Sequence, residues 1–387
     1  MRVAYNLNSI SRVGGTENVV VTKANALAET AGVEVFIIVT DHEEGMGAAA
    51  LLSGAVHLID LDVDYYNDDW KSKWNVLKGF FLKRRVHKRR LTKVLNEISP
   101  DIVVTVSQSE KYMLPDIKGD WVLLRELHYR KDFRSFAAAS RSVFYKIAAR
   151  LSDFYDYRCK ISEYDHIVVL THEDRMNNWG KNDKVSVIPN PITSRSETAA
   201  PLNSRKIVAV GRLTAQKNFA SLIRAFSLVA DRHPDWSLEI YGEGEEREAL
   251  QRQIDSLNLE QNVCLCGNTS RVQEKMLGAS CFVLSSLFEG LPLVMLEAMS
   301  CGLPVVSYDC PCGPKDIITD GVDGFLVATG DERMLADRIC GIIENPDMRA
   351  EMGAAALRKS KNYRIEKIIP MWMELFKRLS DEKRGKC

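Results

Sequence analysis

The stretch that most constrains the fold of this chain covers residues 281–306 and reads CFVLSSLFEGLPLVMLEAMSCGLPVV. The apolar run from Cys281 to Leu284 predicts a buried strand, a helical pattern begins near Leu293, and a second strand-like run opens at Pro304. This succession of strand, loop, helix and strand predicts a parallel sheet that is covered by helices.

Two carboxylates lie at the start of this helix. Glu289 precedes the helix in the loop, Glu297 lies one turn inside it, and seven residues separate the two. Open α/β sheets bind ligands at the carboxyl ends of their strands, where Gly290 permits close backbone approach and the helix N-terminus donates N–H groups to an anion. The two carboxylates can accept hydrogen bonds from sugar hydroxyls, and the helix N–H groups can donate to phosphate oxygens. This combination suits a sugar nucleotide. The alternative is that both residues are ordinary solvated acids.

Length and composition limit the class of protein. The 387 residues suffice for two domains, and the 52 Lys and Arg balance the 52 Asp and Glu, so the overall charge does not indicate a nucleic-acid partner. The first residues lack a charged segment followed by an apolar one, and no apolar run approaches the roughly 18 to 20 residues that span a bilayer. We therefore expect a cytoplasmic protein.

The cysteines indicate no metal site. There are nine, and those at 264, 266 and 281 lie in apolar runs, where we expect small buried thiols in a reducing compartment. Cys310 and Cys312 flank a proline in a loop, and this spacing differs from the paired Cys-x-x-Cys of zinc sites. Asp60, Asp62 and Asp64 alternate along an edge strand or loop, so we interpret them as one exposed face of it.

The first half of the chain alternates predicted strands with helices. Strands are predicted at 2–8, 33–40, 101–107, 121–128 and 166–171, and residues 133–160 predict one or two amphipathic helices. Gly14, Gly15 and Glu17 separate the first strand from the first helix, where backbone amides can approach a ligand. His128 ends the fourth strand beside Glu126; a lone histidine is more often structural, but this place at a strand terminus improves the case for a functional role.

Residues 70–93 are rich in basic and aromatic residues and contain no acidic one. Trp70, Trp74, Phe80 and Phe81 interleave with the cations, a pattern typical of segments that lie on an anionic membrane surface. The alternative is a solvated basic helix whose aromatic side chains pack into the core.

Residues 185–192, in which two prolines flank Asn190, mark the domain boundary, and the polar stretch 193–205 that follows without periodicity suits an interdomain linker. The second half then opens with the strand and turn IVAVGRLTAQKN at 207–218. Arg212 and Lys217 lie in the turn between this strand and the next helix, where two cations can neutralise a diphosphate. A strand at 238–241, a strand and turn at 263–270 and two helices at 331–360 follow.

The motif set resembles the family 4 glycosyltransferases, in which Glu, seven residues, Glu marks the donor site. The resemblance covers nearly the whole chain and implies the α/β GT-B fold, with two Rossmann-like doubly wound domains facing across a cleft. It implies an acceptor-binding domain at 1–190, a nucleotide-sugar-binding domain at 191–362, and a C-terminal helix at 363–387. This helix crosses back toward the first domain and is interrupted at Pro370.

The same resemblance implies residue roles. Arg212 and Lys217 stabilise the departing diphosphate, Glu289 and His128 contact the donor sugar, and Glu297 binds the ribose hydroxyls. No metal or other cofactor is needed. The remaining implied site residues are Gly15, Gly211, Gly290, Leu291, Pro292 and Leu293 on the donor side, and Gly14 and Glu17 on the acceptor side.

The implied activity is transfer of a hexose or N-acetylhexosamine from a nucleotide sugar to an acceptor hydroxyl, with retention at the anomeric carbon. The expected nucleotide is UDP, because it is the more common one in this family. The acceptor is expected to be a lipid-linked or growing bacterial surface glycan, with the protein at the inner face of the plasma membrane. Two alternatives stay open: an isomerase of the UDP-N-acetylglucosamine 2-epimerase type, and a nonenzymatic protein that keeps the fold. Retention of Arg212, Lys217, Glu289 and Glu297 argues against the second.

Overall fold

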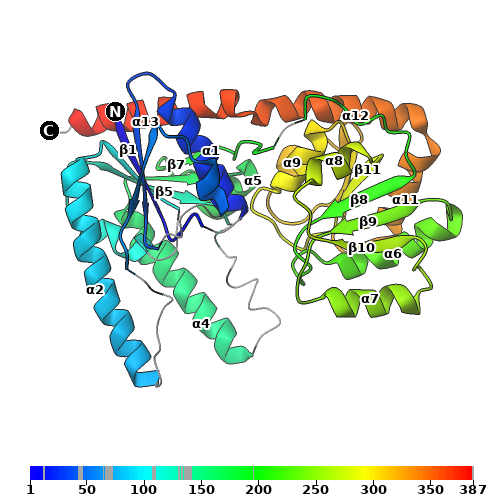
Figure 1. The fold of residues 1–387 in the computed structure, drawn as a ribbon, viewed down its shortest axis with the longest axis horizontal. Coiled ribbons are helices and arrows are strands. Elements are labelled where there is room, and N and C mark those ends of the chain that lie inside the picture. The colour runs from blue at the N-terminus through cyan, green and yellow to red at the C-terminus, as the bar shows by residue number, and fades with distance from the viewer. Residues whose placement is uncertain are drawn as a thin grey trace. The chain divides into compact units, whose positions relative to one another are not determined.

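The computed structural model describes residues 1–11, 14–41, 47–63, 65, 73–106, 110–129, 131, 134, 142–194 and 196–385, with backbone only for 47 and 73–81. The chain forms two compact units. Unit 1 comprises Met1–Leu170, Asp174–Pro191 and Ile365–Cys387, and unit 2 comprises Thr171–Glu173 and Ile192–Arg364. Each unit has its own parallel sheet with helices over its faces (Figure 1).

The sheet of unit 1 has seven parallel strands in the order β3-β2-β1-β4-β5-β6-β7. The strands are β1 (Arg2–Leu7), β2 (Glu34–Val39), β3 (Val56–Asp60), β4 (Ile102–Thr105), β5 (Val122–Leu127), β6 (His166–Val169) and β7 (Val185–Val187). The helices are α1 (Gly15–Ala28), α2 (Lys73–Ile98), α4 (Val143–Phe154), α5 (His172–Asp174), which bridges the unit boundary, and α13 (Ile365–Arg384). Short turns are η1 (Gly47–Leu51), η2 (Glu110–Tyr112), η3 (Leu114–Asp116), η4 (Tyr155–Lys160), η5 (Ile161–Glu163) and η6 (Arg175–Trp179).

The sheet of unit 2 has six parallel strands in the order β10-β9-β8-β11-β12-β13. The strands are β8 (Lys206–Val210), β9 (Ser237–Tyr241), β10 (Val263–Gly267), β11 (Cys281–Leu284), β12 (Val305–Tyr308) and β13 (Gly324–Val327). The helices are α6 (Phe219–Arg232), α7 (Arg247–Ser256), α8 (Val272–Leu277), α9 (Leu293–Ser300), α10 (Pro314–Ile317), α11 (Glu332–Glu344) and α12 (Pro346–Ser360), followed by the turn η7 (Lys361–Tyr363).

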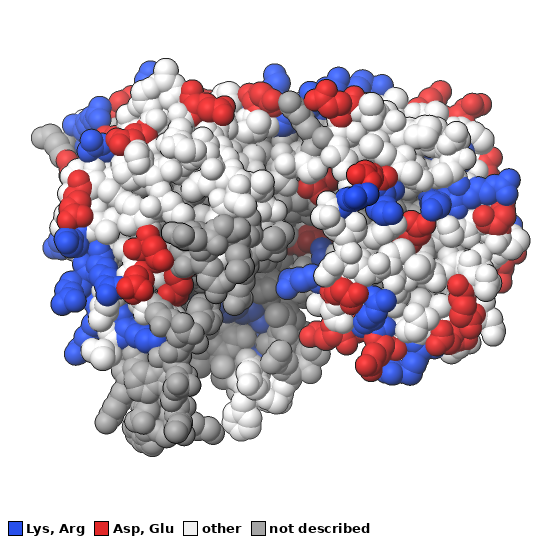
Figure 2. Space-filling view, in the orientation of Figure 1, with Lys and Arg blue, Asp and Glu red and all other residues white. Residues whose placement is uncertain are grey.

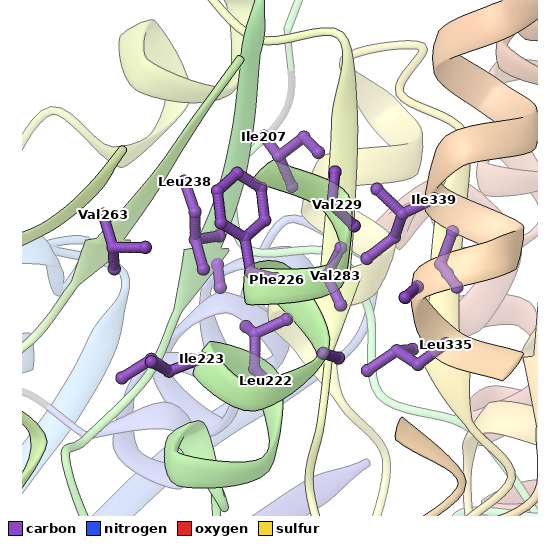
Figure 3. Packing of buried hydrophobic residues seen from close by; sticks show 14 of the residues in the cluster. Ile207, Leu222, Ile223, Phe226, Val229, Leu238, Val263, Val283, Leu335 and Ile339 are labelled. Carbon is purple, nitrogen blue, oxygen red and sulfur yellow. The ribbon is translucent and has the colours of Figure 1, made fainter. Parts of the chain in front are cut away.

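Helix α6 organises the core of unit 2. Its apolar residues recur at helical spacing, so that Leu222, Phe226 and Val229 fall on one buried face. Figure 3 shows Phe226 among side chains from the sheet and from α11, including Leu238 of β9 and Ile339 of α11. Every strand of this sheet contributes to the same apolar cluster.

The last helix completes the core of unit 1. Helix α13 buries Ile368, Trp372, Leu375, Phe376 and Leu379 in the apolar cluster that holds β1 and β2, and it contacts α1. We expected an interruption at Pro370, but the helix is continuous from Ile365 to Arg384 with this proline inside its second turn. Pro370 is exposed, so its ring lies on the face away from the sheet.

The expected strands are present, with two differences. The boundary stretch 185–192 contains a strand, β7, which pairs with β6 at the edge of the unit 1 sheet. The expected burial of Cys264 is wrong: it is exposed and Cys266 is half-buried, because β10 is an edge strand. Asp60 ends the edge strand β3 and Asp62 pairs with Arg90 at 3.4 Å, whereas Asp64 lies outside the described residues.

No helix in the described part of the chain is both long and apolar enough to cross a lipid bilayer. The aromatic part of the expected membrane segment lies largely outside the description, because Trp70 and the side chains of Trp74, Phe80 and Phe81 are not described. The described part of α2 turns His87, Leu91, Leu95 and Ile98 toward the protein and is otherwise exposed or half-buried.

The core of unit 2 predicts a sharp contrast on α6. Phe226→Ala should lower the free energy of unfolding by about 3 to 5 kcal/mol, because it removes a fully buried ring and leaves a cavity. Leu228→Ala on the exposed side of the same helix should cost less than about 1 kcal/mol. Urea unfolding of both variants measures the difference, and equal losses would contradict the packing described here.

Candidate active site

Two loops of unit 2 meet at a Lys–Glu pair. Lys217 follows β8, Glu289 follows β11, and Lys217 Nζ donates a hydrogen bond to Glu289 Oε1 at 2.6 Å. Strands β8 and β11 are neighbours although they are far apart in sequence, so the order of the strands reverses between them. Such a reversal is the place where open parallel sheets hold ligands at the carboxyl ends of their strands.

Further hydrogen bonds fasten the same two loops. Ser285 Oγ donates to the Lys217 carbonyl at 2.8 Å, and the Leu287 amide donates to the Gln216 carbonyl at 2.8 Å. Gln216 Nε2 returns a hydrogen bond to the Phe288 carbonyl at 2.9 Å. The positions of Lys217 and Glu289 are therefore set by backbone contacts as well as by their own ion pair. Sequence reasoning did not find Gln216 or Ser285, because only the folded sheet brings their loops together.

Gly211 and Gly242 allow the backbone to close around Lys217. A Cβ atom on Gly242, which has φ +144°, would lie 1.9 Å from the Gly211 carbonyl oxygen, so only glycine fits there. A Cβ on Gly211 would lie 3.2 Å from Lys217 Cε. The predicted donor residue Gly211 thus lies against the aliphatic part of Lys217.

Arg212 is the second predicted cation of the turn. Its side chain is exposed, and it has no ion pair with any residue in the described ranges, whereas Lys217 is already paired with Glu289. A planar guanidinium in this state offers forked donors to an anion. The structure brings Lys217, Glu289 and Gly211 into contact and leaves the Arg212 head group available to a ligand.

Helix α9 begins directly after the loop of Glu289. Leu293 is its first residue and Pro292 precedes it. The Met295 amide donates to the Pro292 carbonyl at 3.0 Å, whereas the amides of Leu293 and Val294 have no partner within the helix. Gly313, at φ +109°, packs against this start, since a Cβ there would lie 2.4 Å from Pro292 Cδ. The Glu289 amide also donates to the Pro311 carbonyl at 3.2 Å. The 309–313 loop thus holds the predicted donor segment Gly290, Leu291, Pro292 and Leu293 from one side.

Glu297 contacts Thr193, at the beginning of the 192–364 segment of unit 2. It is partly buried, and Thr193 Oγ1 donates a hydrogen bond to Glu297 Oε1 at 3.0 Å. Burial raises the pKa of Glu297 to about 7, although the Thr193 hydrogen bond acts in the opposite direction. This carboxyl is therefore poised to change charge near neutral pH. Thr193 was not recognised from the sequence.

The predicted glycines of unit 1 lie at the N-terminus of helix α1. Gly14 is the N-cap residue in extended conformation, Gly15 is the first helical residue, and Glu17 lies in the first turn. A Cβ on Gly14 would lie 2.1 Å from Glu17 Oε2, so the carboxylate folds back over the cap. An acid at this place is favourable because it faces the positive end of the helix.

His128 lies at the carboxyl end of β5 with both ring nitrogens facing protein groups. Nε2 lies 3.0 Å from Glu126 Oε1, and Nδ1 lies 3.3 Å from Asn190 Nδ2. An amide nitrogen only donates, so Nδ1 accepts from Asn190, whereas Nε2 makes no hydrogen bond with Glu126 despite the short distance. The contact of His128 with a donor sugar, implied by the resemblance, would have to be made by its ring edge or backbone.

A buried ion pair lies behind this histidine. Lys23 Nζ donates to Glu126 Oε1, and both side chains are fully buried. Burial alone would raise the pKa of Glu126, but Lys23 and His128 outweigh it and lower the pKa to about 2. Lys23 Nζ also lies 4.6 Å from the ring centre of Trp372, so α13 covers the pair. The sequence offered no signal for Lys23, which occupies an ordinary helical position in α1.

One group of described residues has the composition of a metal site. Ligand atoms of His233, Cys340 and Glu344 lie within 4.8 Å of one another. Arg232 Nη2 donates to Glu344 Oε1 at 2.7 Å, and His233 Nε2 lies 3.0 Å from the same oxygen. A guanidinium thus already supplies the positive charge, and we interpret the group as an ion-pair cluster at the ends of α6 and α11.

Comparison with known proteins gives the family. Residues 192–359 match the family model described as Glycosyl transferases group 1. An uncharacterized glycosyltransferase of Haemophilus influenzae is 26% identical over 375 residues, which cover 96% of this chain and 98% of the relative. The lipopolysaccharide 1,6-galactosyltransferase of Salmonella typhimurium is 30% identical over 263 residues, 66% of this chain and 68% of the relative.

Among solved structures, Anabaena Alr3699/HepE is similar with a TM-score of 0.73 and 17% identity, covering 97% of this chain and 99% of that one. The two parallel sheets and these likenesses identify the fold as GT-B. The chain belongs to the glycosyl transferases group 1 and is a glycosyltransferase.

The pKa of Glu297 predicts a pH-dependent stability. Between pH 4.5 and about 7 the folded state holds a proton that the unfolded state has lost, so stability falls as pH rises through this window. Glu297→Gln should remove this decrease and be more stable than the parent above pH 7, by at most about 3 kcal/mol. Urea unfolding at pH 5 and 7.5 measures it. Parallel pH profiles of parent and variant would show that the carboxyl titrates normally.

The buried pair predicts a large effect from one partner alone. Lys23→Met should cost about 3 to 5 kcal/mol of stability because it leaves the Glu126 carboxylate buried without its cation. The double variant Lys23→Met/Glu126→Gln should recover part of this loss. Lys88→Met, which breaks an exposed pair with Asp116, should cost less than about 1 kcal/mol. Chemical unfolding of the three variants tests the ranking, and a Lys23 effect as small as that of Lys88 would refute it.

Proposed function

We propose that this chain transfers a hexose or N-acetylhexosamine from a UDP-sugar, with retention at the anomeric carbon, to a hydroxyl of a lipid-linked or growing bacterial surface glycan. The observation that carries the proposal is the Lys217–Glu289 ion pair beside the N-terminus of α9. A cation for a diphosphate, a carboxylate for sugar hydroxyls and the backbone N–H groups at the start of α9 thus lie together at the carboxyl edge of the unit 2 sheet.

The proposed roles follow from the chemistry of these groups. One N–H of Lys217 is used by Glu289, and the ammonium keeps further N–H groups for a phosphate oxygen. Arg212 adds a forked donor, and the first turn of α9 adds backbone N–H groups, so the departing diphosphate meets fixed positive charge. We propose that these groups suffice without a divalent metal.

Glu297 is proposed to bind the ribose hydroxyls of the donor. A carboxyl with a pKa of about 7 becomes a stronger acceptor when it ionises, and hydroxyl donors from a ligand favour the ionised form. Donor binding should therefore lower the pKa of Glu297. His128, held by Glu126 and Asn190, is proposed to contact the donor sugar, and Gly14, Gly15 and Glu17 to border the acceptor and the diphosphate.

Similar proteins support the donor and the acceptor class. The solved structure of Alr3699/HepE holds UDP and glucose, and the Salmonella relative is a lipopolysaccharide galactosyltransferase. Another relative is the poly(ribitol-phosphate) α-N-acetylglucosaminyltransferase of Staphylococcus aureus. We further propose that the protein works at the cytoplasmic face of the plasma membrane and contacts it through residues 70–93.

The first experiment is thermal unfolding with UDP, GDP or ADP at millimolar concentration and a chelator present. A ligand at 100 times its dissociation constant adds about 2.7 kcal/mol to stability. A shift with UDP alone would support a UDP-sugar donor bound without metal and direct the next step to a panel of UDP-sugars. No shift with any of the three would overturn the diphosphate site.

Once a donor is found, Lys217→Ala and Arg212→Ala should each lower kcat/KM by about 10² to 10³, because each removes positive charge from the departing diphosphate. Arg252→Ala, an exposed change on α7, is the matched control and should leave the rate unchanged. Anomeric coupling in the NMR spectrum of the product distinguishes retention from inversion. Normal turnover of both site variants would overturn the assignment.

A further inference from the structure

Helix α4 carries its apolar side chains on the outside of unit 1. None of its residues is buried, and Phe144 is 85%, Leu151 64% and Phe154 62% exposed. Soluble proteins expose single apolar residues commonly, but a row of large ones on one helix marks an interaction surface. This helix was expected from the sequence as amphipathic, and the structure turns its apolar face away from the protein.

The exposed residues form one stripe. Val143, Ile147, Leu151 and Phe154 are spaced by four, four and three residues, which places them on one side of an α-helix. Phe144 widens the stripe, and Tyr155 extends it into η4. Together these residues, 143, 144, 147, 151, 154 and 155, are the apolar stripe of α4.

Buried charges fix this orientation. Asp153, on the opposite side of the helix, accepts a hydrogen bond from Arg134 Nη1 at 2.9 Å. Just beyond the helix, the fully buried Asp156 accepts hydrogen bonds from Lys111 Nζ at 2.5 Å and Arg125 Nη1 at 2.6 Å. Rolling the stripe inward would break these charge-assisted bonds and leave buried charges unpaired. The outward stripe is therefore a stable property of unit 1.

Cations line one flank of the stripe and a groove at its base. Lys146 and Arg150 are exposed on α4, and Arg158 is exposed on η4. A groove of about 440 Å³ beside them is lined by Lys131, Arg150 and Arg158 together with Phe154 and Tyr157. Asp153 also lines the groove, but its charge is taken up by Arg134. Arg150 and Arg158 thus place positive charge along the stripe.

We propose that α4 docks unit 1 on an anionic phospholipid bilayer, with the apolar stripe among the acyl chains and Arg150 and Arg158 at the lipid phosphates. An apolar helix face beside cations is the arrangement that lies in a membrane interface. The proposal extends the membrane contact of residues 70–93 and depends on the proposed setting of the reaction at a membrane.

The position of α4 in unit 1 suits this partner. Helices α2 and α4 both extend downward from the sheet of unit 1 in the view of Figure 1. Lys and Arg side chains gather over α2 in Figure 2. The exposed cations of the described part of α2 include Arg85, Arg89 and Lys93. The cations of α2 provide long-range attraction, and the stripe of α4 provides more apolar surface for insertion than the described part of α2, which exposes Leu82.

Flotation with vesicles tests the proposal. The full-length protein should float with vesicles of phosphatidylglycerol and phosphatidylcholine and not with phosphatidylcholine alone. Phe144→Ser/Leu151→Ser should lower the partition coefficient about tenfold or more by removing inserted apolar surface. Arg150→Gln/Arg158→Gln should also lower it about tenfold and weaken its salt dependence.

Two control variants separate the possible results. Leu228→Ser/Val322→Ser removes exposed apolar residues from unit 2 and should float like the parent protein. Arg85→Gln/Arg89→Gln tests α2 by itself. Loss of flotation only in the α2 variant would overturn the docking role of α4 and leave the contact of residues 70–93 standing.

Other results would also overturn the proposal. These are a parent protein that does not float, an apolar-stripe variant that floats normally, or a concentration-dependent dimer in light scattering that Phe144→Ser/Leu151→Ser abolishes. The UDP-induced thermal shift, measured on every variant, shows that each one is folded. It also reports on the nucleotide site of unit 2 independently, so a failure of membrane docking is distinguishable from a failure of the transferase assignment.

Discussion

Parallel pairing is the constraint on which both units depend. Parallel strands cannot be joined by a tight hairpin, so each connection crosses a face of the sheet, and all carboxyl ends collect at one edge. In unit 2 this places the loop after β8 beside the loop after β11, and Lys217 meets Glu289 there. Charged residues of the site that are distant in sequence thus become neighbours because of the order of the strands.

The sequence could predict elements that depend on local pattern. The strand at Cys281–Leu284 and the helix start at Leu293 were expected at these residues, because an apolar run and a proline before a helix are local signals. The outcome at Cys264 shows the limit. An apolar run predicts a strand but does not say whether the strand is central or at an edge, and β10 is at the edge.

The contacts of the site were less predictable than its members. Spacing singled out Lys217, Glu289 and Glu297, but their partners depend on tertiary structure: Glu289 pairs with Lys217 itself, and Glu297 bonds Thr193. Lys23 had no sequence signal, because a lysine in a helix is ordinarily solvated. Only the folded unit shows it buried against Glu126 and under Trp372.

The division of the chain has a consequence for its synthesis. Unit 1 contains β1 and α1, but its apolar core also includes Trp372 and Phe376 of α13, which follow unit 2 in the chain. The ribosome therefore completes residues 192–364 of unit 2 before it makes α13. During translation the second unit can reach its final fold first, and unit 1 remains incomplete, with Lys23 not yet covered by Trp372, until α13 emerges.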